Sequence, residues 1–366
     1  MKITCNRQEL VNAVLNVQRA TSSKSTMPAL EGILIEAKDN TVKLCGYNLE
    51  LGITTHIKAQ VEKNGKIVLN ARLFSDIIRK LPGETIEINV DKKLIATIES
   101  GLSEFSINGI SPLEYPELPQ LTDTTNVQIP ANILKSMIKQ TIFSIADNDA
   151  KPIHTGILFD IDEESIKLVA VDGYRLALRK ESIKYTNKIS FVIPGKTLQE
   201  IMKILPDAED EATLELSLRH MMLRINDYVV TSRLLEGEFL DYNSAIPESH
   251  TTCAIANTSD FINSVERMSL LITDRLKSPL RCIFNEGEIK FSCTTPIGKA
   301  NDEISATIEG DSVEIGFNNK YLQDALKNTD SDEIKIELSG PLSPMKILPT
   351  QGDSFLFLVL PVRLKS

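Results

Sequence analysis

One stretch of this sequence occurs three times, and its aligned residues lie 124 positions apart in successive copies. Each copy is an apolar, strand-like run that leads into an amphipathic stretch, at residues 67–78, 191–202 and 313–324. Phe74, Leu198 and Leu322 occupy the same position in successive copies. A fixed period indicates a repeated structural unit, and three units of this length fit the 366 residues of the chain.

The first halves of the copies repeat as well, because Gly32-Ile33-Leu34 recurs as Gly156-Ile157-Leu158. Proline-rich stretches at 111–119 and 241–247 separate the copies, and proline cannot continue a central strand. The sequence therefore predicts three domains, at 1–121, 122–247 and 248–366.

Each predicted domain contains two helical and several strand-like patterns. Apolar residues at positions i, i+1, i+4 and i+5 predict six helices with one apolar face, in segments 7–19, 71–80, 131–143, 195–205, 258–277 and 319–327. Alternating runs such as 85–90 and 333–338 predict strands with one solvated face. The predicted fold class is α+β, with two helices packed on antiparallel sheets in each domain.

The charge is unevenly distributed along the chain. The net charge of −10 argues against holding a polyanion by overall attraction, yet the six helical segments carry 14 Lys/Arg and 7 Asp/Glu. The six segments therefore carry a net charge of +7, and the rest of the chain carries a net charge of −17. Lys135 and Lys139 share one face of their predicted helix. Ordinary solvated helix faces explain this pattern, and so does a positive surface that contacts the phosphates of a nucleic acid.

Motifs for catalysis are incomplete. Gly195-Lys196-Thr197 follows a predicted strand and opens a helix, but Ser190 stands where a phosphate-binding loop needs glycine. The chain has no GxG, no CxxC pair among its five cysteines and no clustered histidines among its four. We expect no catalytic residue, no metal and no cofactor. We also expect a cytoplasmic protein, because no apolar run approaches the ~20 residues of a membrane span.

With these features the whole chain resembles the bacterial DNA polymerase III beta subunit, the beta sliding clamp. The matching stretches are Leu81-Pro82, Ser100–Ser106, Tyr115–Leu118, Asp172–Leu176, Phe239–Tyr242 and Leu360–Leu364. The resemblance implies a head-to-tail homodimeric ring of DNA-clamp domains that encircles double-stranded DNA without reading its sequence. It implies a processivity factor that tethers the replicative polymerase, the clamp loader and other proteins, with no chemistry of its own.

By the same resemblance, partner peptides bind a groove between the second and third domains. The matching positions are His154, Val171, Gly173, Tyr174, Arg175, Leu176, Leu240, Ser244, Ala245, Pro344, Leu358, Leu360, Pro361, Val362, Arg363 and Leu364. His154, Val171, Leu240 and Ser244 depart from the residues that the family commonly has there. An apolar groove with a few polar anchors is the usual form of such a site.

Two further surfaces follow from the resemblance and the helix pattern. The DNA-facing residues are expected to be Lys24, Arg72, Arg79, Lys135, Lys139, Asn148, Lys151, Lys196 and Lys203. Phe105 and Ile107 on an edge strand are expected to meet Leu271 and Ile272 of a second copy. The alternatives are a nucleotide-dependent enzyme that uses Lys196 and a monomeric protein-binding scaffold built on the same repeat.

Overall fold

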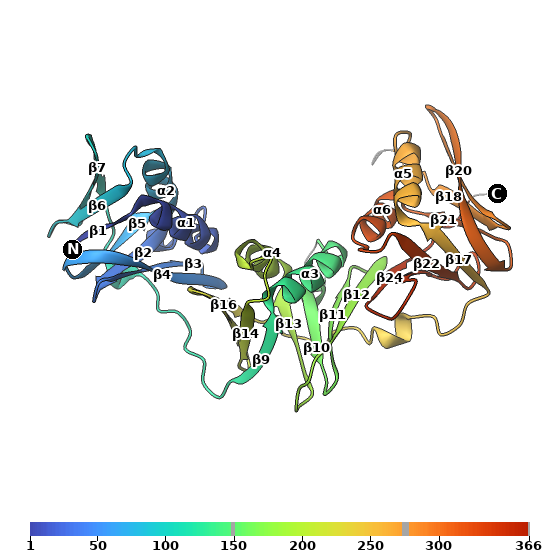
Figure 1. The fold of residues 1–366 in the computed structure, drawn as a ribbon, viewed down its shortest axis with the longest axis horizontal. Helices are drawn as coiled ribbons and strands as arrows, with labels where there is room; N and C mark the ends of the chain where they lie inside the picture. Colours follow the sequence, from blue (N-terminus) through green and yellow to red (C-terminus); the bar gives the residue numbers. More distant parts are fainter. Residues whose placement is uncertain (148–150, 273–277, 365–366) are drawn as a thin grey trace. The chain divides into compact units, whose positions relative to one another are not determined.

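The computed structural model describes residues 1–147, 151–272 and 278–364 (Figure 1). The described chain forms two compact units. The first contains Met1–Lys135 and Gln199–Leu234, and the second contains Ser136–Leu198 and the chain from Leu235 onward. Each unit is held together by one 12-stranded antiparallel sheet.

The secondary structure repeats three times as eight strands and two α-helices. The first copy consists of β1 (Lys2–Asn6), α1 (Arg7–Val17), β2 (Gly32–Lys38), β3 (Thr41–Tyr47), β4 (Leu51–Lys63), β5 (Gly65–Asn70), α2 (Ala71–Lys80), β6 (Thr85–Val90), β7 (Ile95–Ser100) and β8 (Ser103–Asn108). The second consists of β9 (Thr125–Pro130), α3 (Ala131–Thr141), β10 (Gly156–Ile161), β11 (Ser165–Val171), β12 (Arg175–Ser182), β13 (Ile189–Pro194), α4 (Gly195–Ile204), β14 (Glu211–Leu216), β15 (His220–Ile225) and β16 (Tyr228–Arg233). The third consists of β17 (Thr252–Asn257), α5 (Thr258–Ser269), β18 (Leu280–Asn285), β19 (Glu288–Thr295), β20 (Gly298–Gly310), β21 (Val313–Phe317), α6 (Asn319–Lys327), β22 (Glu333–Leu338), β23 (Met345–Pro349) and β24 (Phe355–Val359).

The sheets do not follow the boundaries of the copies. The first sheet runs β8-β7-β6-β1-β4-β16-β15-β14-β9, with β2, β3 and β5 attached through β4. The second runs β13-β10-β11-β12-β24-β23-β22-β17-β20-β19-β18-β21. The second copy therefore gives strands to both sheets, and β16 and β24 each pair with the fourth strand of the preceding copy.

Asparagine side chains fix where four of the helices begin. Asn6, Asn70, Asn257 and Asn318 each accept a hydrogen bond from a backbone N–H in the first turn of α1, α2, α5 and α6. Such caps satisfy N–H groups that have no partner inside the helix. The apolar faces behind them are buried, with Phe74 on α2 and Phe261 on α5 fully enclosed. The helices are thereby held against the sheets by the residues that repeat.

The structure confirms the α+β class, the six predicted helices and the antiparallel sheets. The predicted helix at 258–277 is wrong in its extent, because α5 ends at Ser269 and residues 273–277 lie outside the described part. The helices predicted at 7–19 and 131–143 change to 3-10 geometry after Val17 and Thr141. Apolar residues continue beyond Thr141 and Ser269, so the periodic pattern alone overruns these two helix ends.

Candidate partner and nucleic-acid interfaces

An apolar floor lies where β12 pairs with β24 in the second unit. Leu176 lies opposite Leu358 in this antiparallel pair, and Val171 follows on the neighbouring strand β11. These three side chains are buried and pack in one cluster with Tyr242 from the segment that follows β16. The predicted groove residues of β11, β12 and β24 therefore lie together. Their side chains are packed against one another and are not exposed.

Arg175 joins this floor to the third copy. Its guanidinium donates to the carboxylate of Asp172, with Nε 2.9 Å from Oδ2, and to the carboxylate of Asp324 on α6. It also lies over the ring of Tyr321, 4.6 Å from the centroid, and over the ring of Phe143 at 5.6 Å. A buried cation with two carboxylate partners and two aromatic faces is held in one geometry.

Aromatic side chains lie among the predicted groove residues. The exposed ring of Tyr174 stacks on Tyr321 with centroids 5.8 Å apart, so α6 contributes an aromatic neighbour that was not predicted from the sequence. His154 meets Phe239 edge to face at 5.4 Å. Burial lowers the pKa of His154, and the neighbouring Lys151 lowers it further, so His154 is neutral at pH 7.

The segment after β24 leads from the groove to another strand. The backbone N–H of Leu360 donates to Tyr174 O at 2.9 Å, and the N–H of Val362 donates to Gly316 O on β21 at 2.8 Å. Leu360 and Val362 are 38% and 40% exposed. Of the remaining predicted groove residues, Gly173, Leu240, Ser244 and Arg363 are exposed, and Ala245, Pro344, Pro361 and Leu364 are half-buried. The predicted groove set thus divides between the β12–β24 floor and the edge of β21.

The predicted DNA-facing cations differ in their pairing. Arg79 pairs with Asp76 at 2.7 Å, Lys135 with Asp207 at 2.8 Å and Lys203 with Glu200 at 2.8 Å. These contacts reduce the positive charge that the helices present. The remaining described cations of this set are exposed and have no ion-pair partner in the described residues: Lys24, Arg72, Lys139, Lys151 and Lys196. Asn148 lies outside the described residues.

The four predicted dimer residues are not equally accessible. Phe105 is 42% exposed on β8, which is an edge strand of the first sheet, and Ile107 is half-buried on the same strand. Leu271 is half-buried, whereas Ile272 is 8% exposed and belongs to the core of its own unit. Leu270, which is not among the four predicted residues, is 79% exposed.

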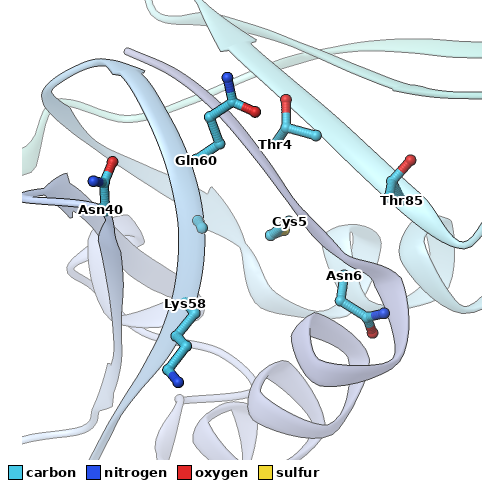
Figure 2. A pocket seen from close by; sticks show the side chains of 8 residues that line it. Thr4, Cys5, Asn6, Asn40, Lys58, Gln60 and Thr85 are labelled. Atoms are coloured by element: carbon cyan, nitrogen blue, oxygen red, sulfur yellow. The ribbon is translucent and has the colours of Figure 1, made fainter.

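A surface depression in the first unit, shown in Figure 2, has no catalytic character. Side chains of β1, β4 and their neighbours line it, including Asn6, Asn40, Gln60 and Lys58. Cys5 also lines it, but burial raises the pKa of this thiol to about 12, so it is protonated and unreactive at neutral pH. The lining therefore combines amides and hydroxyls with one lysine and supplies no activated nucleophile.

Gly195-Lys196-Thr197 does not form a phosphate loop. Residues 189–194 form β13 and pair with β10 in register, and α4 begins directly at Gly195. In the described ranges no group of three or more His, Cys, Asp or Glu could hold a metal ion. No helix in those ranges has the length and hydropathy to cross a membrane. The repeated units and the apolar surface at β12 and β24 are typical of a protein that binds other macromolecules.

Comparisons with known proteins agree with this class. Three domain descriptions of the DNA polymerase III beta subunit match the chain: the N-terminal domain at 1–119, the central domain at 128–241 and the C-terminal domain at 243–363. The chain belongs to the DNA polymerase III beta subunit family. It is accordingly a non-catalytic accessory subunit.

Relatives and solved structures cover the full length. The chain is 35% identical to the "Beta sliding clamp" of Bacillus subtilis (strain 168), over 99% of this chain and 100% of that one. It is 33% identical to the "Beta sliding clamp" of Staphylococcus epidermidis, over 99% of each chain. The structure superposes on the Bacillus subtilis DNA polymerase sliding clamp with a TM-score of 0.97, at 35% identity and complete coverage of both chains. A beta subunit structure from Eubacterium rectale gives 0.95 at 33% identity, also with complete coverage.

Proposed function

We propose that this chain works in the cytoplasm as a DNA polymerase processivity factor, a head-to-tail homodimeric ring that slides on duplex DNA. The observation that carries the proposal is a strand pairing that occurs twice within the chain. One strand of the first copy and one strand of the third copy lack the partner that this pairing would give them. The last strand of one copy pairs with the fourth strand of the preceding copy, as β16 with β4 and β24 with β12.

Two strands lack this pairing. β8, the last strand of the first copy, ends its sheet beyond β7. On β20, the fourth strand of the third copy, residues 298–305 pair with β19 alone among the described strands. An open strand edge is a template for another chain. Pairing β8 with β20 of a second copy repeats the internal rule, and two such contacts close a ring with two-fold symmetry.

The repeat also gives the register of this contact. Val230 lies opposite Ile53 and Phe357 lies opposite Ala177 in the two internal pairs. The equivalent positions at the open ends are Phe105 on β8 and Ala300 on β20. Ser106 then lies opposite Lys299, so the register of the intermolecular pair is defined residue by residue.

Apolar side chains surround the open edge of β20. Leu270 and Ile297 are 79% and 65% exposed, and a Cβ at Gly298 would lie 3.8 Å from Leu271 Cδ1. Phe105 would be brought to this patch by the proposed register. Burying such residues against a second copy removes exposed apolar surface, which is the driving force of most protein association.

Enclosure explains how an acidic chain retains DNA. The chain carries −10 overall, and only part of the helix charge is free of ion pairs in the described residues. Tight phosphate contacts would resist sliding and depend steeply on salt, whereas a closed ring needs only weak ones. Lys24, Arg72, Lys139, Lys151 and Lys196 are the residues proposed to provide them.

The groove is the proposed attachment point for the polymerase, the clamp loader and other partners. Leu176 and Leu358 provide an apolar floor, and Tyr174 and His154 provide the rim. Arg175 fixes the junction of β12 with α6 that frames this surface. A short peptide with apolar side chains matches a groove of this composition.

A cysteine cross-link tests the ring. Ser106→Cys combined with Lys299→Cys places the new thiols on opposed residues of the proposed intermolecular pair, so mild oxidation should yield covalent dimers. The matched control combines Ser106→Cys with Glu303→Cys, four residues along β20, and should cross-link far less. Equal cross-linking of both variants, or of neither while sedimentation gives a monomer, contradicts the proposed ring.

A further inference from the structure

The first strand of a copy lies between two other strands in the first and third copies. β1 pairs with β6 on one side and with residues 59–63 of β4 on the other. β17 pairs with β22 and with residues 306–310 of β20 in the same way. In both copies, the second half of a long fourth strand therefore covers one edge of the first strand.

The second copy leaves the equivalent edge open. β9 pairs with β14 and is the last strand of its sheet, so its other edge has no partner among the described strands. The fourth strand of this copy, β12, ends at Ser182 after 8 residues, whereas β4 and β20 have 13 residues each. Beyond β12, the N–H groups of Ile183 and Tyr185 donate to Glu164 O and Glu163 O at 2.9 and 3.2 Å. The continuation of β12 is thus bonded to the turn between β10 and β11.

The size of one side-chain pair explains the difference between the copies. Where the covering strand meets the first strand, Cys5 lies opposite Ala59 in the first copy, and two alanines are opposed in the third. The repeat places Ile129 and Ile183 at these positions in the second copy. Cys5 and Ile129 are 4% and 3% exposed, so this position of the first strand faces the core. A small residue therefore fits opposite it, whereas a second isoleucine would overpack it.

The open edge of β9 lies beside an unpaired carboxylate. Asn126 and Gln128 are exposed on β9, and Gln128 Nε2 donates to Glu211 Oε1 on β14 at 2.7 Å. Glu211 lies opposite Pro130 and has no ion-pair partner in the part of the chain that the structure describes. An open strand edge is a template for another strand. A strand added here would meet negative charge in the row of Pro130.

The strands that cover this edge in the other copies indicate what fits it. Residues 59–62 are Ala-Gln-Val-Glu, and residues 306–309 are Ala-Thr-Ile-Glu. Both have a small residue opposite the core-facing side chain of the first strand and a β-branched residue two positions later. In the register of β1 with β4, Lys58 precedes this small residue and corresponds to the row of Pro130 and Glu211. An extended segment of the pattern Lys-Ala-x-Val therefore matches the edge in size and in charge.

We propose that the open edge of β9, residues 125–130, is a docking site for an extended segment of a partner protein with the pattern Lys-Ala-x-Val. The segment adds a strand antiparallel to β9, with its alanine opposite Ile129 and its lysine paired with Glu211. Backbone hydrogen bonds provide the affinity, and Ile129 provides the specificity because it excludes a large side chain opposite it. The site contains none of the groove residues, and it does not depend on ring closure.

The size rule is tested with two peptides on the full chain. A fluorescein-labelled peptide with the sequence of residues 57–64 should bind saturably at 1:1 stoichiometry in fluorescence anisotropy, and hydrogen–deuterium exchange should slow in residues 125–130. The same peptide with Ala59→Ile should bind about tenfold more weakly, because its enlarged side chain is opposed by Ile129. Ile129→Ala in the protein should restore the affinity for the enlarged peptide. The peptide pair tests the site without any change to the protein.

The charge rule is tested with two exposed acidic residues of the same sheet. Glu211→Lys should weaken binding of the unchanged peptide severalfold, because it replaces the carboxylate that the peptide lysine meets. Asp227→Lys, in the turn between β15 and β16, is the matched control and should leave the affinity unchanged. Equal weakening by both variants would show attraction to the overall charge and would overturn the proposed pairing with Glu211.

The remaining outcomes decide where the peptide binds. Equal affinity for the two peptides overturns the proposal, and so does binding that leaves exchange in residues 125–130 unchanged. Binding that is lost with Tyr174→Ala places the peptide in the groove and overturns the proposal as well. Failure to bind up to the solubility limit of the peptide contradicts it. Exchange in residues 125–130 that slows with protein concentration alone would assign the edge to a second copy of the chain instead.

Discussion

Gly316 and Val362 lie so close together that no side chain fits between them. The N–H of Val362 donates to Gly316 O at 2.8 Å, and a Cβ at Gly316 would lie 2.7 Å from Val362 O and from Leu364 Cδ2. The equivalent positions in the first two copies hold Val68 and Val192. The third copy thus uses glycine where the segment after its last strand comes closest.

Gly316→Val should displace the segment at 362–364 from β21. A backbone oxygen at 2.7 Å cannot move aside as the end of a flexible side chain can, and such overpacking costs about 1–3 kcal/mol. We expect a lower midpoint of thermal unfolding, together with loss of polymerase stimulation in a primer-extension assay. Sedimentation should still give a dimer, and full stimulation would show that this segment is not part of the partner site.

Tyr321 should contribute to partner binding through its ring and not through its hydroxyl. The ring stacks on Tyr174 and lies beneath Arg175, so Tyr321→Ala removes both contacts. We expect polymerase stimulation to fall about thirtyfold, since aromatic and cation–π contacts each contribute about 1 kcal/mol. Tyr321→Phe keeps the ring and is the matched control. Equal loss in both variants would contradict the stacking role.

Phe105→Asp should weaken the dimer by at least tenfold in analytical ultracentrifugation. A carboxylate at this position of β8 would lose its hydration when a second copy covers the edge, and this desolvation opposes dimer formation. Leu113→Asp places the same charge on a side chain that is 95% exposed in the same unit, and it should leave the dimer unchanged. An unaltered dimer with Phe105→Asp would exclude β8 from the contact.

Binding of apolar partner peptides should weaken as the pH falls from 7 to 5. The pKa of His154 is lowered by burial and by Lys151, so the neutral ring persists to a lower pH than in an ordinary histidine and then gains a charge beside Phe239. Isothermal titration at several pH values should show this decrease, and His154→Leu should flatten it. An unchanged profile in the variant would assign the pH dependence to another group.

The sequence predicts the parts of this protein that depend on periodicity. The repeat at Phe74, Leu198 and Leu322 identifies the helices and the three copies of the strand-and-helix pattern, because buried residues recur with the secondary structure. The two compact units are not visible in it, because the second copy gives strands to both sheets. Contacts between distant segments are not visible in that pattern. The pairing of Lys135 with Asp207 and the stacking of Tyr174 on Tyr321 depend on chain reversals that periodicity does not encode.

Burial of single residues near element ends also escapes the sequence. Leu270, Leu271 and Ile272 form one apolar run, yet the first is 79% exposed and the last is 8% exposed. The helix ends at Ser269, so the following residues leave its apolar face and take different directions. The resemblance points to Leu271 and Ile272 for the contact with a second copy, and Leu270 beside them exposes more of its side chain than either.

Retention on DNA of defined topology tests the central claim most directly. The dimer is loaded by a clamp loader onto nicked circular DNA, separated from free protein by gel filtration, and then the circle is cut at one site. Enclosure predicts co-elution with the circle at high salt and release soon after the cut, because a ring slides off an open end. Protein that stays on the linear DNA and is removed only by salt would show adhesion instead and would contradict the account.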